Sequence, residues 1–405
     1  MLKYWVWLSE LKGLRNQTKL ALLRRCGDPE SIFYADPDEL SLTEGADLSQ
    51  LKLLENHELA QADRILADCQ RLDIGLLTFS DAAYPGRLKN IYDPPVLLYG
   101  RGRMPLFDEE AAVSVVGTRT CTPYGISAAE ELGYQLAKEG AVVVSGLARG
   151  IDGASHRGAL RAGGFTAAVL GGGVDVVYPA ENRRLYEDIA ATGVLLSEYP
   201  PGTEPMGSHF PVRNRILSGL SLAVLVVEAP ERSGALITAN TALEQGRDVF
   251  AVPGPIDAPN SRGSNRLIRD GAGLVTCGWD ILEGYRSRFP HRLRPSPENL
   301  PPVPEQDSLP AQRAEESSTA KPEKKETPPA LPVLDLTADT AGLTDDQIRI
   351  LQVLTTDAPL LTDDVAERAD LPIRRVLSAL TVLEIDGYAT QHGARRFVRT
   401  VEIRL

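Results

Sequence analysis

Three glycine-containing strings decide the fold of this chain: VSVVGTRT (113–120), VVVSGLARGID (142–152) and AAVLGGGVDVVYP (167–179). In each string a run of apolar residues stops at glycine, and a polar or helical segment follows. This pattern is typical of strand-to-helix turns at the carboxyl edge of a parallel sheet. The sequence therefore predicts an α/β core whose functional site lies along that edge.

Alternating strand and helix patterns continue through the core. Strands are expected at 112–116, 141–145, 166–170, 194–197, 222–227 and 249–252, and helices at 124–139, 151–162, 183–191, 235–245 and 265–269. Residues 198–208 read as a long polar loop, and 76–79 and 96–99 as two short strands upstream. Repeated strand–helix units of this length predict a doubly wound parallel sheet.

The segments on either side of the core differ from it in residue composition and pattern. Residues 1–74 carry leucines at helical spacing, with breaks at Gly13 and Gly27, which predicts a bundle of short helices. Residues 291–341 are rich in proline, with few large apolar side chains, and predict a flexible linker. Residues 342–405 predict three helices and a hairpin turning at His392–Gly393, the order of a winged helix. The core domain is thus expected over 75–290.

Composition limits the classes of partner. The 405 residues carry a net charge of −12, so a nucleic acid would have to be held by a local basic cluster. The four cysteines are far apart in the sequence, which argues against a disulfide framework or a metal site and favours a reducing compartment. No apolar run approaches membrane-spanning length. We expect a cytoplasmic protein with no membrane partner.

The glycine turns and the arginines that follow them predict an anion site. Glycine lets backbone N–H groups approach an anion, and the next helix adds positive potential at its N-terminus. Guanidinium groups suit phosphates and also stack on bases, as Tyr178 and Phe210 could. A groove of this kind holds single strands with little sequence preference. The glycines so placed are Gly117, Gly146, Gly150, Gly171 and Gly173, and the arginines are Arg119, Arg149, Arg183, Arg184, Arg213 and Arg215.

A competing interpretation is that these arginines pair with nearby carboxylates, of which Glu181, Asp188, Glu198 and Glu204 are the candidates. Enzyme chemistry has weaker support. Neither the dinucleotide fingerprint GxGxxG nor a P-loop string occurs, so no nucleotide cofactor is expected. Asp152, His156 and Asp175 form no catalytic arrangement. We expect Asp152 to orient the helix that carries His156, and Asp175 to brace its own loop.

The C-terminal segment leaves two kinds of partner open. Its third helix exposes Arg374, Arg375, Ser378 and Thr381, as a recognition helix would. Acidic residues nearby offset those arginines, and the hairpin, with Arg395, Arg396 and Arg399, is the more basic part. Duplex DNA and protein are equally compatible with this pattern.

Together these strings resemble the DNA-processing protein A family, also called DprA or Smf. The resemblance covers nearly all of residues 76–284 and rests on the density and order of many short strings. These include DPPVLLYGRG (93–102), SGLARGIDGASH (145–156), GGGVDVVYPAEN (171–182), SEYPPG (197–202), HFPVRNR (209–215), SGALITA (233–239) and DVFAVPG (248–254). The resemblance implies an extended Rossmann core, a sterile-alpha-motif-like N-terminus and a winged-helix C-terminus.

The resemblance also implies a function. The chain would be a homodimeric protein of natural transformation that binds and protects single-stranded DNA and loads the recombinase RecA onto it, without catalysis or cofactor. Carried over string by string, its DNA site would comprise Arg119, Gly146, Arg149, Gly173, Asn182, Arg183, Phe210, Arg213, Asn214 and Arg215. Many relatives have lysine where Arg183 stands, and Arg149 occupies a variable position of its string.

Two alternatives belong to other classes. The core also resembles the lysine-decarboxylase-like Rossmann group, whose members hydrolyse N-glycosidic bonds of nucleotides with a PGGxGTxxE string. The counterpart here, RSGALITAN (232–240), lacks the glutamate at that spacing. A transcription factor acting through its winged helix would need a more basic recognition helix, and would leave the arginines of the core unexplained.

Overall fold

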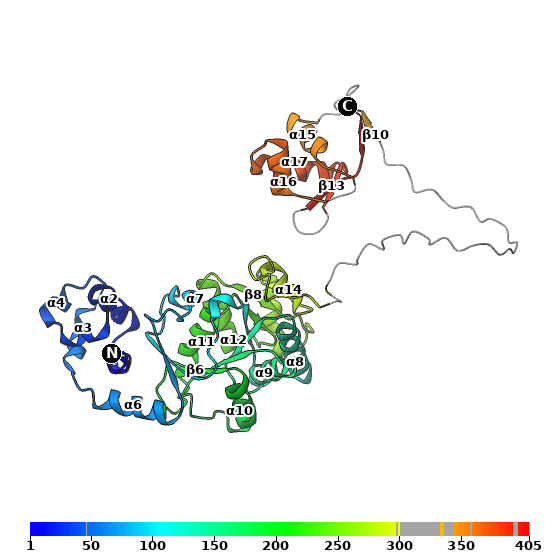
Figure 1. The fold of residues 1–405 in the computed structure, drawn as a ribbon. Coiled ribbons are helices and arrows are strands. Elements are labelled where there is room, and N and C mark those ends of the chain that lie inside the picture. Colours follow the sequence, from blue (N-terminus) through cyan, green and yellow to red (C-terminus); the bar gives the residue numbers. More distant parts are fainter. Residues whose placement is uncertain are drawn as a thin grey trace, which may run out of the picture. The chain divides into compact units, whose positions relative to one another are not determined.

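The computed structural model describes residues 1–45, 47–296, 299, 333–335, 343–356, 359–391 and 396–404. The chain divides into two compact units, Met1–Asp307 and Ser308–Leu405, whose elements are labelled in Figure 1. Among the described helices, none combines the length and the apolar character that crossing a bilayer requires.

A nine-stranded sheet forms the centre of the first unit, in the order β1-β2-β6-β5-β4-β3-β7-β8-β9. The strands are β1 (Gly75–Thr78), β2 (Leu97–Gly102), β3 (Ala112–Val116), β4 (Val142–Ser145), β5 (Thr166–Val169), β6 (Val194–Ser197), β7 (Ala223–Val226), β8 (Asp248–Ala251) and β9 (Gly273–Leu274). Strands β3 to β9 run parallel, which confirms the predicted Rossmann-like core. The two short upstream strands join the same sheet antiparallel, with Gly102 opposite Val194. The sheet is therefore mixed, with an antiparallel edge of the kind common in large sheets.

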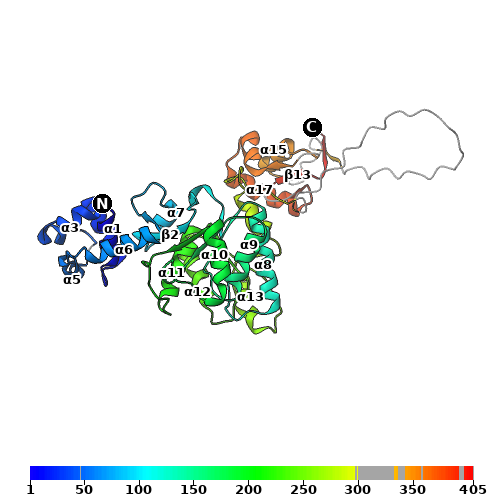
Figure 2. The same ribbon diagram turned by 60° about the horizontal axis from the view of Figure 1, so that its bottom comes forward.

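Helices cover both faces of the sheet (Figure 2). Along β3 the side chains alternate: Val113 and Val115 pack in one apolar cluster with α8 and α9, while Ala112 and Val116 pack in the other with α11 and α12. One face carries α7 (Gly86–Lys89), α11 (His209–Leu220), α12 (Gly234–Glu244) and α13 (Arg262–Arg269). The opposite face carries α8 (Pro123–Lys138), α9 (Ile151–Arg161), α10 (Arg183–Thr192) and α14 (Trp279–Leu282).

Helix α11 was not expected from the sequence. It begins at His209, directly after the loop predicted for 198–208, and Pro211 is its third residue. Proline normally argues against a helix, but the first-turn N–H groups of a helix have no intrahelical partner, so proline is tolerated there. This helix carries Phe210, Arg213 and Arg215, and it therefore decides where those side chains lie.

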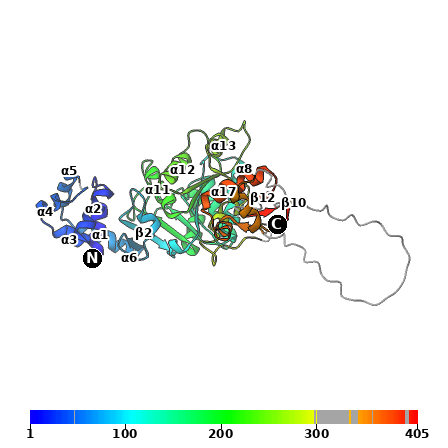
Figure 3. The same ribbon diagram turned by 90° about the horizontal axis from the view of Figure 1, so that it is seen from above.

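Short helices form a lobe beside β2 in all three views (Figure 3). They are α1 (Leu2–Glu10), α2 (Asn16–Cys26), α3 (Pro29–Tyr34), α4 (Pro37–Ser41), α5 (Leu48–Leu51) and α6 (Ala60–Arg71). Helix α1 is the centre of the lobe, because Trp5, Trp7 and Leu8 are all buried. Trp7 also donates its indole N–H to the carbonyl oxygen of Asn56 at 2.7 Å. The expected short helices are present; their likeness to a sterile alpha motif stays a prediction.

The second unit has the element order expected of a winged helix. It contains α15 (Asp345–Val353), α16 (Thr362–Ala369) and α17 (Ile373–Ile385), with a sheet of β11 (Leu360–Leu361), β13 (Arg396–Arg399) and β12 (Ala389–Gln391). A separate parallel pair joins β10 (Val333–Asp335) to β14 (Glu402–Arg404). The turn predicted at His392–Gly393 lies outside the described residues.

The packed core continues past the boundary expected at residue 290. Leu293 is buried against the sheet, and the backbone N–H of Arg294 donates to the carbonyl oxygen of Glu139 at 2.9 Å. Most of the predicted linker, 291–341, lies outside the described residues.

Candidate functional site

A hollow of about 430 Å³ opens at the carboxyl edge of the sheet. Its walls come from the turn after β3, the loop after β4 and the first turns of α11 and α12. The first two glycine turns therefore meet where the sequence predicts. The polar and aromatic side chains among its lining residues are Thr118, Arg119, Thr120, Asp152, Phe210, Arg213, Asn214, Arg232, Ser233 and Thr238.

Arg119 and Phe210 form a flat surface in this hollow. The guanidinium carbon of Arg119 lies 4.7 Å from the ring centroid of Phe210, and the Arg119 side chain is exposed. Phe210 in turn contacts Tyr178, with ring centroids 5.8 Å apart and planes tilted by 33°. A cation over an aromatic face, next to a second ring, offers both a phosphate partner and a stacking surface for a base.

Arg213 lies beneath this surface and is almost fully buried, with 3% of the residue exposed. Its Nη1 donates to the carbonyl oxygens of Gly146, at 2.9 Å, and Val169, and its Nε donates to Asn214 Oδ1 at 3.3 Å. Burial lowers the pKa of Arg213 to about 10, although the Asp152 carboxylate opposes that shift. Its main role in this structure is to join α11 to the ends of β4 and β5.

The backbone N–H groups of two predicted glycines are already used inside the protein. The N–H of Gly146 donates to Asp152 Oδ2 at 3.1 Å, and the N–H of Gly173 donates to the carbonyl oxygen of Thr203 at 2.9 Å. Burial raises the pKa of the Asp152 carboxyl. The expected cradle of free N–H groups is thus not formed at these positions, where glycine instead permits close packing of neighbouring loops.

Asn182, Arg183 and Arg149 lie beside the hollow and are not among the residues that line it. Asn182 Nδ2 donates to the carbonyl oxygen of Leu147 at 3.0 Å, which ties the start of α10 to the loop after β4. Arg149 Nε lies 2.9 Å from Glu181 Oε1, a pairing of the kind that the competing interpretation proposes, and its place in the DNA site stays a prediction. Arg183 is exposed in the first turn of α10.

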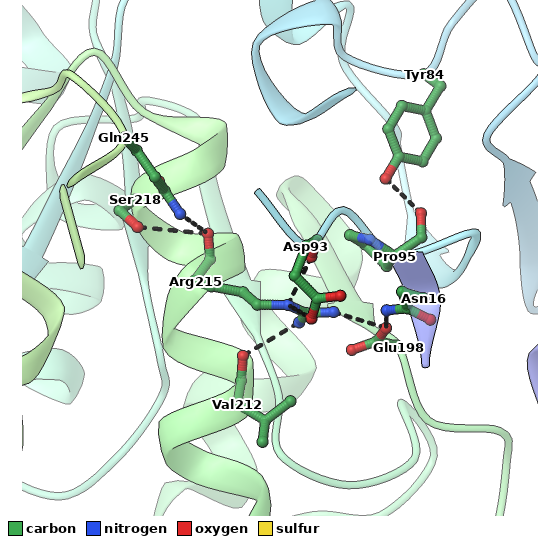
Figure 4. Close-up of polar contacts among 9 residues, drawn as sticks. All are labelled: Asn16, Tyr84, Asp93, Pro95, Glu198, Val212, Arg215, Ser218 and Gln245. Carbon is green, nitrogen blue, oxygen red and sulfur yellow. Dashed lines mark hydrogen bonds and ion pairs between the residues drawn. The ribbon is translucent and has the colours of Figure 1, made fainter. Parts of the chain in front are cut away.

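Arg215 points away from the hollow, toward the N-terminal lobe (Figure 4). Its Nε donates to Asp93 Oδ2 at 2.9 Å and its Nη2 to Glu198 Oε1 at 2.8 Å. Asn16 of helix α2 donates to the same Glu198 oxygen at 3.0 Å. Burial acts to raise the pKa of Glu198, but the charge and hydrogen bond of Arg215, the hydrogen bond of Asn16 and the charge of Lys19 together outweigh it, so the pKa is lowered. Arg215 was expected in the DNA site, but here the competing interpretation of pairing with a carboxylate describes it, and the pair fastens the lobe to the core.

Sequence reasoning missed Arg232 and the N-terminus of α12. Arg232 is exposed in the hollow, and Ser233 caps the helix by accepting from the N–H of Ala235 at 3.3 Å. A helix N-terminus favours negative charge. The available signal was the string RSGA after the apolar run 222–227, another strand–turn–helix pattern.

The regions that match known protein families correspond to the core and the winged helix of this chain. Residues 75–286 match the family described as DNA recombination-mediator protein A, and residues 334–395 match the DprA winged helix domain. The chain belongs to the DNA recombination-mediator protein A family. It is 46% identical to DNA processing protein DprA of Bacillus subtilis over 225 residues, 56% of this chain and 76% of that protein. It is 37% identical to Protein Smf of Escherichia coli over 324 residues, 79% of this chain and 77% of that protein.

A solved relative supports the fold. The X-ray structure of DNA processing protein A from Streptococcus pneumoniae superposes with a TM-score of 0.62 at 37% identity, covering 70% of this chain and 98% of that one. The Rossmann-like core and the winged helix are thereby established for this chain, together with membership of a DNA-processing, recombination-mediator family.

The polar residues considered for catalysis have structural roles. His156 is fully buried, its Nδ1 lies 2.7 Å from Thr166 Oγ1, and burial lowers its pKa to about 3. Asp175 accepts from the N–H of Gly202 at 2.9 Å. The expectation that Asp175 braces its own loop was thus wrong, because it anchors the neighbouring 198–208 loop instead.

The winged helix offers fewer free cations than its sequence suggests. Arg375 on α17 donates to both carboxylate oxygens of Asp346 at 2.7 Å. Arg399 donates to the carbonyl oxygen of Leu351 at 3.1 Å, whereas Arg374 and Arg396 are exposed. Arg395 lies outside the described residues.

Proposed function

We propose that this family member binds single-stranded DNA in the hollow at the carboxyl edge of the sheet, protects it and passes it to the recombinase RecA without catalysing a reaction. The observation that carries the proposal is the exposed guanidinium of Arg119 stacked 4.7 Å from Phe210 inside that hollow. Exposed bases and phosphates of a single strand are the ligands that such a surface fits, whereas a duplex keeps its bases stacked inside.

Four further features support an anionic, planar ligand. The volume falls within the range of ligand pockets, about 300–1,000 Å³. Arg232 and the N-terminus of α12 also line the hollow and add positive potential there. Asn214, which also lines the hollow, offers an amide to a base edge. Arg183 and Arg149, beside the hollow, are placed to follow the strand as it leaves.

The lining of the hollow supports a binding protein rather than a hydrolase. Asp152 is the one carboxylate among the lining residues, all of which the structure describes, and it accepts hydrogen bonds from the N–H groups of Gly146 and Ala148. A glycosidic-bond hydrolase needs a carboxylate that can reach the substrate. The first turns of α12 contribute Ser233, Gly234, Ala235, Ile237 and Thr238 to the lining, none of them acidic.

Fluorescence anisotropy tests the binding step. Labelled oligothymidine and a duplex of equal length are titrated with the protein and with Phe210→Leu, which removes the aromatic face but keeps an apolar side chain. We expect the unaltered protein to prefer the single strand, and Phe210→Leu to lose about 1–3 kcal/mol of binding free energy, the value of one stacked base. The control is Tyr92→Leu, at a ring that is 83% exposed. Equal affinity for strand and duplex, unchanged in Phe210→Leu, would reject the hollow as a single-strand site.

The later steps need their own test. A RecA filament formation assay on single strands coated with single-strand-binding protein should start sooner when this protein is added. We expect Arg119→Ala to abolish that effect, because delivery requires the strand to be held first. The homodimer, a duplex contact through the winged helix and a cytoplasmic location remain parts of this proposal, and the first is measured by light scattering of the purified chain.

A further inference from the structure

A second basic surface lies at the opposite edge of the same sheet. The string RSRFPHRLR (286–294) places Arg286, Arg288, His291, Arg292 and Arg294 within nine positions of a chain whose net charge is −12. We call these five residues the basic strip. All five side chains are exposed, and the strip begins where the match to the recombination-mediator family ends, at residue 286.

The strip is a fixed part of the first unit. Phe289 and Leu293 alternate with the basic residues and are buried in the cluster beneath the sheet. A Cβ on Gly140, just before β4, would collide with the carbonyl oxygen of Arg292, so the two backbones are in close contact. The cations are therefore held against the starts of the parallel strands.

The cations of the strip are mostly free to bind a ligand. Arg292 Nη2 lies 2.9 Å from Glu110 Oε1. Arg286, Arg288 and Arg294 have no carboxylate partner within 4 Å among the described residues. Two carboxylates near this edge are engaged elsewhere, since Asp108 pairs with the buried Arg87 and Asp248 accepts from Tyr285.

A groove of about 540 Å³ runs beside the strip. Arg292 and Arg294 line it together with Lys138 and Arg103. The guanidinium of Arg103 lies 5.3 Å from the ring centroid of Phe165, which also lines the groove. Guanidinium groups over an aromatic face suit the phosphates and bases of an unpaired strand better than the carboxylates of an acidic protein, which need no stacking partner.

We propose that the basic strip and this groove form a second contact for single-stranded DNA, used only by strands long enough to leave the first hollow and reach the other edge of the sheet. This inference rests on the proposed function. The two sites are separated by the length of strand β3, five residues or about 15 Å, plus its flanking turns. A short oligonucleotide would fill the hollow alone, and a longer one would engage both.

The test compares two oligothymidine lengths, about 8 nucleotides, which lies within the usual site size of a single-strand-binding domain of about 4–16 nucleotides, and about 40, which is well beyond it. The full chain carrying Arg288→Ala with Arg294→Ala is titrated against a control with Arg24→Ala and Arg64→Ala, two exposed arginines of the N-terminal lobe. We expect the strip variant to bind the long strand about tenfold more weakly than the control, with a salt slope smaller by about 1.4, the value of two phosphate contacts. Both variants should bind the short strand equally well.

The outcomes separate the two proposals. Equal binding of the long strand by the strip variant and the control would overturn the second contact and leave the strip for an acidic partner, while the hollow stands. An equal loss on both lengths would show that the strip belongs to the first site and would overturn a separate contact. Failure of the unaltered protein to bind either strand would overturn the single-strand function and this inference together.

Discussion

Arg213 on α11 donates a hydrogen bond to the carbonyl oxygen of Gly146 at 2.9 Å, which joins the helix to the end of β4. Because the guanidinium is buried, Arg213→Ala would leave the carbonyl oxygens of Gly146 and Val169 without this donor and would remove the positive charge that offsets the buried Asp152 carboxylate. We expect a loss of about 3 kcal/mol in unfolding free energy, measured by urea denaturation. Arg119→Ala, at an exposed arginine of the same hollow, should change stability by less than about 0.5 kcal/mol. Equal stability of the two variants would contradict this role of Arg213.

The ion pair between Glu198 and Arg215 holds the N-terminal lobe against the core, so we expect the lobe to loosen when the pair is weakened. Glu198→Gln weakens the contact to Arg215 and to Asn16 of α2. We expect a loss of about 2 kcal/mol, little affected by salt because the pair is buried, and faster proteolytic release of the lobe. Glu187→Gln, at an exposed glutamate of α10, is the control. If both variants were cleaved at the rate of the unaltered protein, the pair would not be what fastens the lobe.

We expect the burial of His156 to make the stability of the folded protein sensitive to acid. Its pKa in the folded protein is about 3, below the ordinary value of 6.5, so the unfolded chain takes up the proton first as pH falls. The contribution of neutral His156 to the free energy of unfolding is therefore complete above pH 6.5. It is lost as the pH falls toward 3, at up to about 1.4 kcal/mol per pH unit. In denaturation at pH 7, 6 and 5, His156→Asn should show a shallower decline of stability than His57→Asn, the same change at an exposed histidine. If the stability of the two variants declined equally with falling pH, the lowered pKa of His156 would be refuted.

We expect the backbone conformation at Gly150 to affect single-stranded DNA binding through the position of Arg119. Its φ is 75°, and a Cβ there would lie 2.5 Å from the carbonyl oxygen of Thr118 and 2.9 Å from that of Arg119. Gly150→Ala should therefore displace Arg119 and weaken single-strand binding, besides the cost of about 1–3 kcal/mol for alanine at a φ of 75° and a ψ of −125°, a region that side chains other than glycine rarely adopt. Gly163→Ala shares the positive φ but has open space around it. That control should lose stability while keeping full affinity for DNA; a parallel loss of affinity in both variants would argue against the steric link.

The sequence predicted the parallel core because its strands are short apolar runs, three of them ended by glycine, which is a local signal. Strand β6 was predicted with the bounds that the structure shows, Val194–Ser197. Pairing across the sheet was not predictable in this way, since nothing in 76–79 or 96–99 indicates that β1 pairs with β2 and β2 with β6, both antiparallel. Helix α11 was missed because Pro211 reads as a breaker unless its place in the first turn is known.

Prediction of the candidate site from the sequence was limited in the same way. Arg119 and Phe210 were predicted and do meet, because both follow parallel strands, β3 and β6, whose carboxyl ends lie at the same edge of the sheet. Spacing alone did not distinguish them from Arg213 and Arg215, which lie three and five residues after Phe210 on a helix whose faces were unknown. One of these side chains braces the sheet ends, and the other turns toward the N-terminal lobe.

The most direct test of the account is the affinity of Arg119→Ala for a short labelled oligothymidine across a salt series. Arg24→Ala, which removes one exposed charge from the N-terminal lobe, is the matched control. The account predicts that Arg119→Ala binds about tenfold more weakly than the control, with a salt slope smaller by about 0.7, the value of one phosphate contact. Equal affinities and equal slopes for the two variants would show that the hollow at the carboxyl edge is not where the strand binds.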